Sequence, residues 1–157
     1  MHSAKLIGLI EILTNCEIIE GLEEDKTLFA TDVKQPHRAL VFCQMQSFMH
    51  IVETDVLKHH NIKYLTLTGA MTAKQRLETV DLFNHNPQYK ILLLTTSVGG
   101  LGLTLTGADV VIFVEHDWNP MKDLQAMDRA HRIGQTRTVN VYRLIVKDTI
   151  EEKIMSL

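Results

Sequence analysis

The chain has few of the features that mark membrane, secreted or metal-binding proteins. Its 157 residues include two cysteines, three prolines and one tryptophan. No apolar run approaches the roughly 20 residues that span a bilayer, and the first residues do not resemble a signal peptide. Cys16 and Cys43, near the ends of an expected helix and an expected strand, have no Cys or His neighbour at metal-ligand spacing. We expect a soluble intracellular protein with two reduced thiols and no metal site.

The charge is not that of a strongly basic nucleic-acid binder. The formal net charge is −3, and it is unevenly distributed. Residues 17–36 hold six acidic residues against two lysines, whereas the rest of the chain carries a net charge of +1. We predict that residues 17–36 form an exposed acidic loop or insertion within a single domain spanning residues 1–157. The charge neither requires nor excludes a DNA partner.

Apolar runs rich in β-forming residues alternate with helical patterns along the chain. Strands are expected at residues 38–43, 63–67, 91–95, 110–114 and 138–145, and helices at residues 47–58, from Thr72, after Pro120 and from Thr149. Strands that do not alternate and are separated by helices indicate a parallel sheet covered on both faces, so the predicted fold is a three-layer α/β domain. Ligands of such sheets bind at the carboxyl ends of the strands.

The most informative segment is residues 125–135, QAMDRAHRIGQ. At helical spacing, Gln125, Asp128, Arg129 and Arg132 share one stripe, and the two guanidiniums can reach one polyphosphate. The alternative is an ordinary helix ion pair between Asp128 and Arg132, worth a few tenths of a kcal/mol. This segment alone does not decide between them.

The loop after the third strand, residues 95–104, supplies three glycines and four hydroxyls. Both groups suit phosphate contacts. The loop lacks the Lys-Ser/Thr ending of a P-loop and fails the dinucleotide fingerprint, so nucleotide binding by this domain alone in either familiar way is not expected. A tight turn is the alternative.

Trp118, the only tryptophan, follows the fourth strand within the segment EHDWNP, residues 115–120. Three ligand-type side chains in a row point apart from one another, which disfavours a metal site. Trp118 is either a buried plug under its loop or an exposed ring able to stack on a base.

In combination, residues 125–135, 117–120 and 95–106 resemble the second RecA-like lobe, or helicase C-terminal lobe, of the Swi/Snf-type ATPases, a branch of the superfamily-two helicases. The resemblance covers nearly the whole chain. Within that family, residues 114–127 are most similar to the subfamily of remodellers that remove TATA-box-binding protein from promoter DNA.

The resemblance implies a role for each matching residue at an ATP site between two lobes. Arg129 and Arg132 match the catalytic arginines that reach the ATP phosphates, with Arg132 as the arginine finger, and Gln125 belongs to the same nucleotide-binding motif. Gly100 and Gly102 match a glycine-rich loop that touches nucleotide and DNA backbone.

The resemblance also implies contacts to duplex DNA. They come from four residues, Gln44, Thr95, Thr96 and Trp118. The chain departs from the family at Ser97, where many members carry Arg, and at Thr104, where many carry Asn. Contacts that the family makes through those two positions are not carried over.

The family's first lobe supplies the P-loop lysine and the acidic residues that hold Mg²⁺, and neither motif occurs in this sequence. The resemblance therefore implies a nuclear, DNA-dependent ATPase whose ATP and Mg²⁺ are held mainly by a first lobe of the same polypeptide. The isolated chain is expected to be inactive. The alternative is a non-catalytic RecA-like interaction module whose arginines only pair with Asp128 and neighbouring carboxylates.

Overall fold

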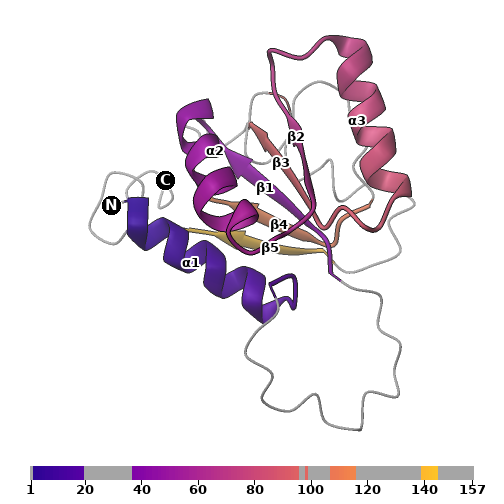
Figure 1. Cartoon of the computed structure of the whole chain (residues 1–157). Helices are drawn as coiled ribbons and strands as arrows, with labels where there is room; N and C mark the ends of the chain where they lie inside the picture. The colour runs from indigo at the N-terminus through magenta and orange to yellow at the C-terminus, as the bar shows by residue number, and fades with distance from the viewer. Residues whose placement is uncertain (1, 20–36, 96–97, 99–106, 116–138, 145–157) are drawn as a thin grey trace, which may run out of the picture.

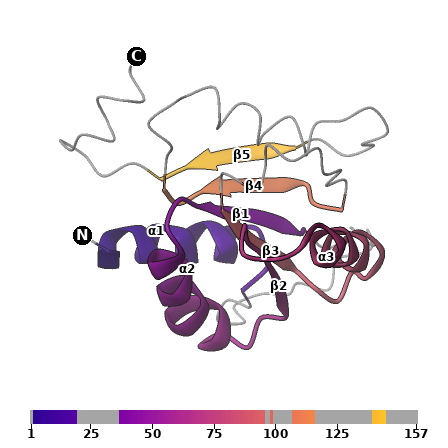
Figure 2. The same ribbon diagram turned by 90° about the horizontal axis from the view of Figure 1, so that it is seen from above.

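The computed structural model describes residues 2–19, 37–95, 98, 107–115 and 139–144. Within this part of the chain, five strands form one sheet (Figure 1). They are β1 (Ala39–Cys43), β2 (Tyr64–Leu67), β3 (Ile91–Thr95), β4 (Val110–Phe113) and β5 (Asn140–Arg143). Their order is β2-β3-β1-β4-β5 and every neighbouring pair is parallel (Figure 2). The predicted parallel α/β fold is confirmed.

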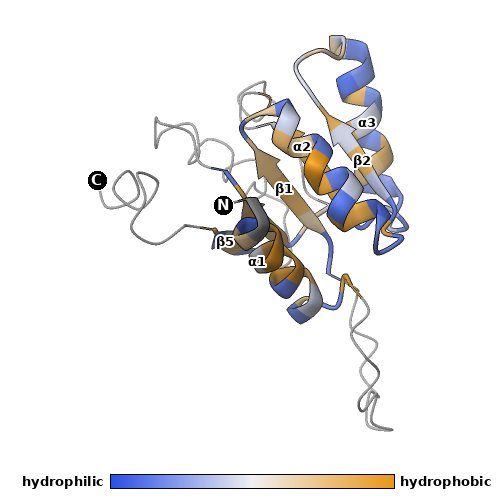
Figure 3. Ribbon diagram, turned by 60° about the vertical axis from the view of Figure 1, so that its left-hand side comes forward, coloured by the Kyte–Doolittle hydropathy of each residue, from blue (hydrophilic) through white to orange (hydrophobic). Residues whose placement is uncertain are grey.

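Helices cover both faces of the sheet. They are α1 (His2–Asn15), α2 (Gln46–Val52), which continues into the π-helical segment η1 (Glu53–Lys58), and α3 (Ala73–His85). Buried side chains of α1, α2 and η1 pack on one face, and those of α3 pack on the other. Figure 3 shows α1 and α2 lying beside the apolar β1. No helix among the described residues is long and apolar enough to cross a membrane.

The sheet is buried because its central strands are apolar on both sides. All five residues of β1 and of β3 are buried. Val41 belongs to the core under α1 and α2, whereas the next residue, Phe42, belongs to the core under α3. This alternation between faces is the two-residue period of a strand, and it explains why an unbroken apolar run was the correct signal for these strands.

The helix after β2 begins as its sequence predicts. Thr72 is the N-cap of α3, its side chain accepts a hydrogen bond from the backbone of Gln75 at 3.2 Å, and the Gln75 side chain accepts one from the Thr72 backbone at 2.9 Å. This capping box satisfies two backbone donors that the helix itself leaves unpaired. Leu77 does not join the core and is 61% exposed, whereas Val80 and Phe83 are buried.

The turn after α1 covers the first three residues of the predicted acidic loop at residues 17–36. Glu17 has φ of 61°, the backbone N–H of Glu17 bonds Thr14 O at 3.0 Å, and that of Ile18 bonds Leu13 O at 2.9 Å. These are the two bonds of a Schellman motif, which turns the chain back on the helix. Ile18 and Ile19 are consequently buried with Leu13 in the core and are not part of an exposed loop. Residues 20–36 lie outside the described part.

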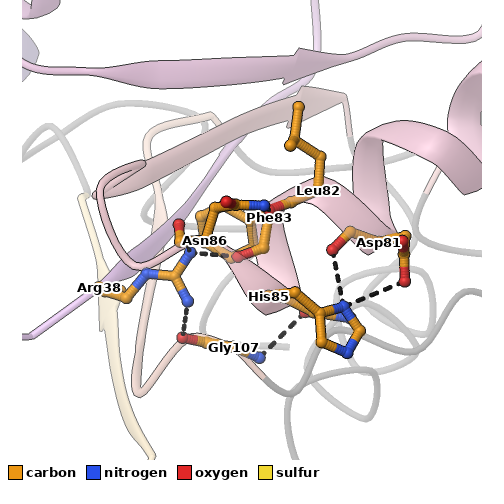
Figure 4. A network of polar contacts seen from close by, with 8 residues as sticks. Arg38, Asp81, Leu82, Phe83, His85, Asn86 and Gly107 are labelled. Carbon is orange, nitrogen blue, oxygen red and sulfur yellow. Dashed lines mark hydrogen bonds and ion pairs between the residues drawn. The ribbon is translucent and has the colours of Figure 1, made fainter.

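A buried arginine organises the amino-terminal edge of the sheet. Arg38, directly before β1, is 6% exposed. Its guanidinium donates to the carbonyl oxygens of Gly107 at 2.8 Å and Asn86 at 3.2 Å, and also to that of Phe83 (Figure 4). It donates further to the carbonyl oxygen of Tyr89 at 3.0 Å. It lies 4.1 Å from the centre of the Phe83 ring. One side chain thus joins the end of α3, the approach to β3 and the approach to β4.

The backbone around Arg38 is held as well. Asp109 Oδ1 accepts from the Arg38 backbone N–H at 2.9 Å, and Asp109 Oδ2 lies 2.5 Å from Nδ1 of His37. Gly107 packs so closely that a Cβ there would lie 2.7 Å from Nη1 of Arg38 and 3.0 Å from Oδ1 of Asn84. Only glycine fits at position 107 without displacing this network.

Replacing Arg38 by lysine is expected to lower the free energy of unfolding by about 2–4 kcal/mol, because an ammonium group cannot serve four carbonyls in the plane of a guanidinium. Chemical denaturation of residues 1–157 measures the change. The matched control is Arg76→Lys, since Arg76 donates to the single carbonyl of Met71, and its expected loss is below about 1 kcal/mol. Equal stabilities of wild type and Arg38→Lys would contradict the assigned role of the guanidinium.

Candidate functional site

The carboxyl ends of the five strands meet at one edge of the sheet, and the loops predicted to carry function all start there. The register places Cys43 beside Thr95, Phe113 beside Phe42, and Arg143 beside Phe113. Parallel strands necessarily gather their carboxyl ends on one side. The Arg38 network occupies the opposite edge, so the residues that stabilise the sheet and those expected to bind ligands are separated.

Two of the predicted site residues lie in the described part of the chain, Gln44 and Thr95. Gln44 is half-buried and directly follows β1. Thr95 ends the neighbouring β3 and is only 6% exposed. The structure therefore brings the two to adjacent strand ends, with Gln44 the more accessible. A DNA contact by either remains a prediction.

The other predicted site residues lie outside the described part. They are Thr96, Gly100, Gly102, Trp118, Gln125, Arg129 and Arg132. Their assigned roles remain predictions. Whether Arg132 contacts phosphate or only pairs with Asp128 also remains a prediction. The strands that precede these segments, β3 and β4, are described, and they lie on either side of β1.

Val98 is the one residue between Thr95 and Gly107 that the structure describes. It is 1% exposed and packs in the core under α3 together with Phe42, Leu94 and Phe113. The glycines and hydroxyls of this loop indicate a phosphate cradle or a turn, and nothing in the local sequence reveals that Val98 is buried.

Two aromatic rings lie near the carboxyl ends of β1 and β4, and an arginine at the end of β5 lies beside them. The rings of Phe42 and Phe113 stack with centroids 5.0 Å apart, and the Arg143 guanidinium lies 5.2 Å from the centre of the Phe113 ring. This geometry allows a cation–π interaction. Sequence reasoning missed Arg143 because it was one residue of an expected strand with no motif around it.

Glu115 was also missed as a structural contact. The Met45 backbone N–H donates to its Oε1 at 3.4 Å, which connects the loop after β1 with the segment after β4. In the sequence, Glu115 stands out only as one of three adjacent ligand-type side chains. Among the residues that the structure describes, no group of three His, Cys, Asp or Glu side chains is placed to hold a metal ion.

Cys43 lies under this edge and is fully buried. Burial raises the pKa of its thiol far above the ordinary value, the Glu115 carboxylate raises it further, and the Lys5 ammonium opposes both. Cys16 is buried at the end of α1, and burial raises its pKa too. Both thiols are therefore neutral at pH 7, as expected for cysteines that fill space in a core.

Comparison with known proteins places this fold in a class. Residues 16–134 match the helicase conserved C-terminal domain family, and the chain belongs to that family. The chain also superposes on the crystal structure of the C-terminal part of the Fun30 ATPase domain with a TM-score of 0.82 and 33% identity. That alignment covers 98% of this chain and 44% of the other.

Relatives along the full length of the chain are more specific. It is 54% identical to human TATA-binding protein-associated factor 172 and 49% identical to TATA-binding protein-associated factor MOT1 of Saccharomyces cerevisiae. Those alignments cover 99% and 100% of this chain but 8% and 9% of the relatives. The chromatin-remodeling ATPase INO80 of Arabidopsis thaliana is 53% identical over 76% of this chain and 8% of its own length. The predicted family resemblance is confirmed.

Neither cysteine is expected to react with Ellman's reagent at pH 8 in the folded chain, because each is buried and its raised pKa keeps the thiol protonated. Both should react within seconds once guanidinium chloride unfolds the protein. Absorbance of the released thiolate at increasing denaturant measures the number of reactive thiols. Rapid labelling of Cys43 in the native state would contradict its burial under the carboxyl edge.

Proposed function

We propose that this chain is the C-terminal half of a Swi/Snf-type, ATP-dependent DNA translocase motor. The observation that carries the proposal is that the carboxyl ends of β1, β3 and β4 lie side by side at one edge of a RecA-like sheet. The family match spans residues 16–134 and so includes every residue to which a nucleotide or DNA role was assigned. Because the chain spans only 8–9% of its TATA-binding protein-associated relatives, the activity belongs to the longer protein.

In this proposal the catalytic contribution of the chain is positive charge at the ATP phosphates. Arg129 and Arg132 supply guanidiniums, Arg132 as the finger, and Gln125, Gly100 and Gly102 line the nucleotide. Guanidinium forks match phosphate oxygens in geometry and remain charged throughout. ATP and Mg²⁺ are held mainly by a first RecA-like lobe, since this sequence has no P-loop and no acidic Mg²⁺ motif.

The same edge offers a surface to duplex DNA in this proposal. Gln44 is half-buried at the end of β1, and Thr95 ends the adjacent strand. Because Thr95 is almost covered, its contribution is to place Thr96 rather than to extend its own side chain. Trp118 follows β4 in the sequence, and its proposed role is to stack against a base or sugar.

The names of the relatives support a biological setting. Human and yeast relatives are named TATA-binding protein-associated factors, and a plant relative is named a chromatin-remodeling ATPase. We infer a nuclear transcription regulator that removes TATA-box-binding protein from DNA, and that contacts this partner through regions outside these 157 residues. The chain itself supplies the motor half.

Arg132→Ala in the full-length protein is expected to reduce DNA-stimulated ATP hydrolysis by roughly 10³-fold or more, because an arginine finger stabilises charge in the transition state. Steady-state phosphate release in saturating DNA measures the rate. The control is Lys63→Ala, which removes a cation just before β2, on the opposite edge of the sheet. Unchanged turnover in Arg132→Ala would favour the non-catalytic interaction module instead.

The isolated chain of residues 1–157 is expected to show no ATP hydrolysis above background, with or without duplex DNA, since phosphoryl transfer needs the metal and P-loop of the other lobe. Phosphate release assayed over hours tests this. A DNA-stimulated rate in a preparation free of contaminating ATPase would contradict the division of the site between two lobes.

A further inference from the structure

Helices α2 and α3 begin in different ways. α3 carries its own capping box, Thr72 with Gln75. α2 has Met45 at its N-cap, in an extended conformation with φ of −112° and ψ of 136°, and no side-chain cap hydrogen bond from that residue. The first backbone N–H groups of a helix have no partner within it and carry partial positive charge. The backbone N–H groups at the start of α2 therefore take their partners from water or from other parts of the fold.

Glu115 provides that partner from 70 residues away. Its Oε1 accepts the Met45 backbone N–H at 3.4 Å, so a carboxylate beyond the end of β4 faces the start of α2. An anionic side chain at this position is favourable for the helix dipole as well as for the hydrogen bond. The same carboxylate is close enough to act on Cys43 at the end of β1, as is Lys5 of α1.

The hydrogen bond between Met45 and Glu115 follows directly on the pairing of β1 with β4. β1 and β4 are hydrogen-bonded neighbours, and the backbone N–H of Val114 donates to Phe42 O at 3.0 Å. Past that bond β1 and β4 are no longer paired, and the contact between Glu115 and Met45 connects the residues that follow them. Gln44 is the single residue between Cys43, the last residue of β1, and Met45. Its position is therefore set from both sides.

We propose that Glu115 is a positioning residue that caps α2 from the end of β4 and thereby holds Gln44 in place beside the segment that follows β4. The inference rests on the proposed function for its consequence, because Gln44 and Trp118 are the residues assigned to DNA on those two segments. Glu115 acts through Gln44 and is not itself a catalytic residue.

The cap can be tested without any activity by hydrogen exchange of residues 1–157. Glu115→Ala is expected to speed amide exchange about threefold to tenfold in peptides covering residues 45–52, which is the ratio that corresponds to the usual cost of losing a helix cap. Peptides covering residues 73–85 serve as the internal reference, since α3 has its own cap. Glu11→Ala on α1 removes an exposed carboxylate and is expected to change neither set. Unchanged exchange at residues 45–52 would overturn the inference.

The functional consequence is tested in the full-length protein by ATP hydrolysis against DNA concentration. Glu115→Ala is expected to raise the half-saturating DNA concentration about threefold to tenfold while the rate at saturating DNA stays within about twofold of wild type. Glu115→Gln retains an acceptor oxygen, so its half-saturating concentration should fall between those of wild type and Glu115→Ala. A merely less stable protein would instead lose maximal rate, and would not be rescued at high DNA.

The proposed motor function and the positioning role of Glu115 can be contradicted separately. A wild-type full-length protein without DNA-stimulated hydrolysis would contradict the proposed function and leave the exchange experiment to decide on the cap. Normal stimulation of wild type, with the same half-saturating DNA concentration in Glu115→Ala, would overturn the positioning role of Glu115 while the proposed function stands.

Discussion

The fold depends on the buried guanidinium of Arg38. A charge withdrawn from water costs several kcal/mol unless its donors are satisfied, and here four carbonyls and the face of Phe83 surround it. Those carbonyls belong to segments that are distant in sequence, the end of α3 and the approaches to β3 and β4. Since carbonyls at a helix end carry partial negative charge, the arginine also suits the carboxyl end of α3. One side chain thereby fixes the amino-terminal edge of the sheet.

Because the stabilising contacts of Arg38 lie at the amino-terminal edge, the carboxyl edge of the sheet is left for ligand binding. The strands are held in place where they begin and are buried along their length. Their carboxyl ends therefore lie at defined positions, whatever the length of the loops that follow. The loops can then vary without loss of the core, which is the physical reason that ligand sites of parallel sheets gather at this edge. The stacked rings of Phe42 and Phe113 and the buried side chain of Val98 extend the packed core up to the start of those loops.

Local signals were sufficient wherever the determinant was local. The unbroken apolar run at residues 91–95 predicted β3, and Thr72 with Gln75 predicted the start of α3. Contacts between distant residues were not predictable. Arg38 was placed inside a strand because nothing near it in the sequence reveals the four carbonyl oxygens that it binds. Glu115 accepts from the backbone N–H of Met45, which lies 70 residues away in the sequence. Ile18 and Ile19 were assigned to a loop by the acidic charge around them, although the turn at Glu17 returns them to the core.

The contrast between α3 and α2 has a mechanical consequence. A helix capped by its own side chains keeps its start when neighbouring loops move, whereas a helix capped from another strand is coupled to that strand's continuation. α2 is of the second kind, and its cap comes from the first residues after β4. A displacement of Glu115 is therefore expected to affect Met45 and Gln44, whereas the start of α3 depends on Thr72 and Gln75 instead. Because β4 and β1 are neighbours, this coupling acts over a short distance and needs no rearrangement of the sheet.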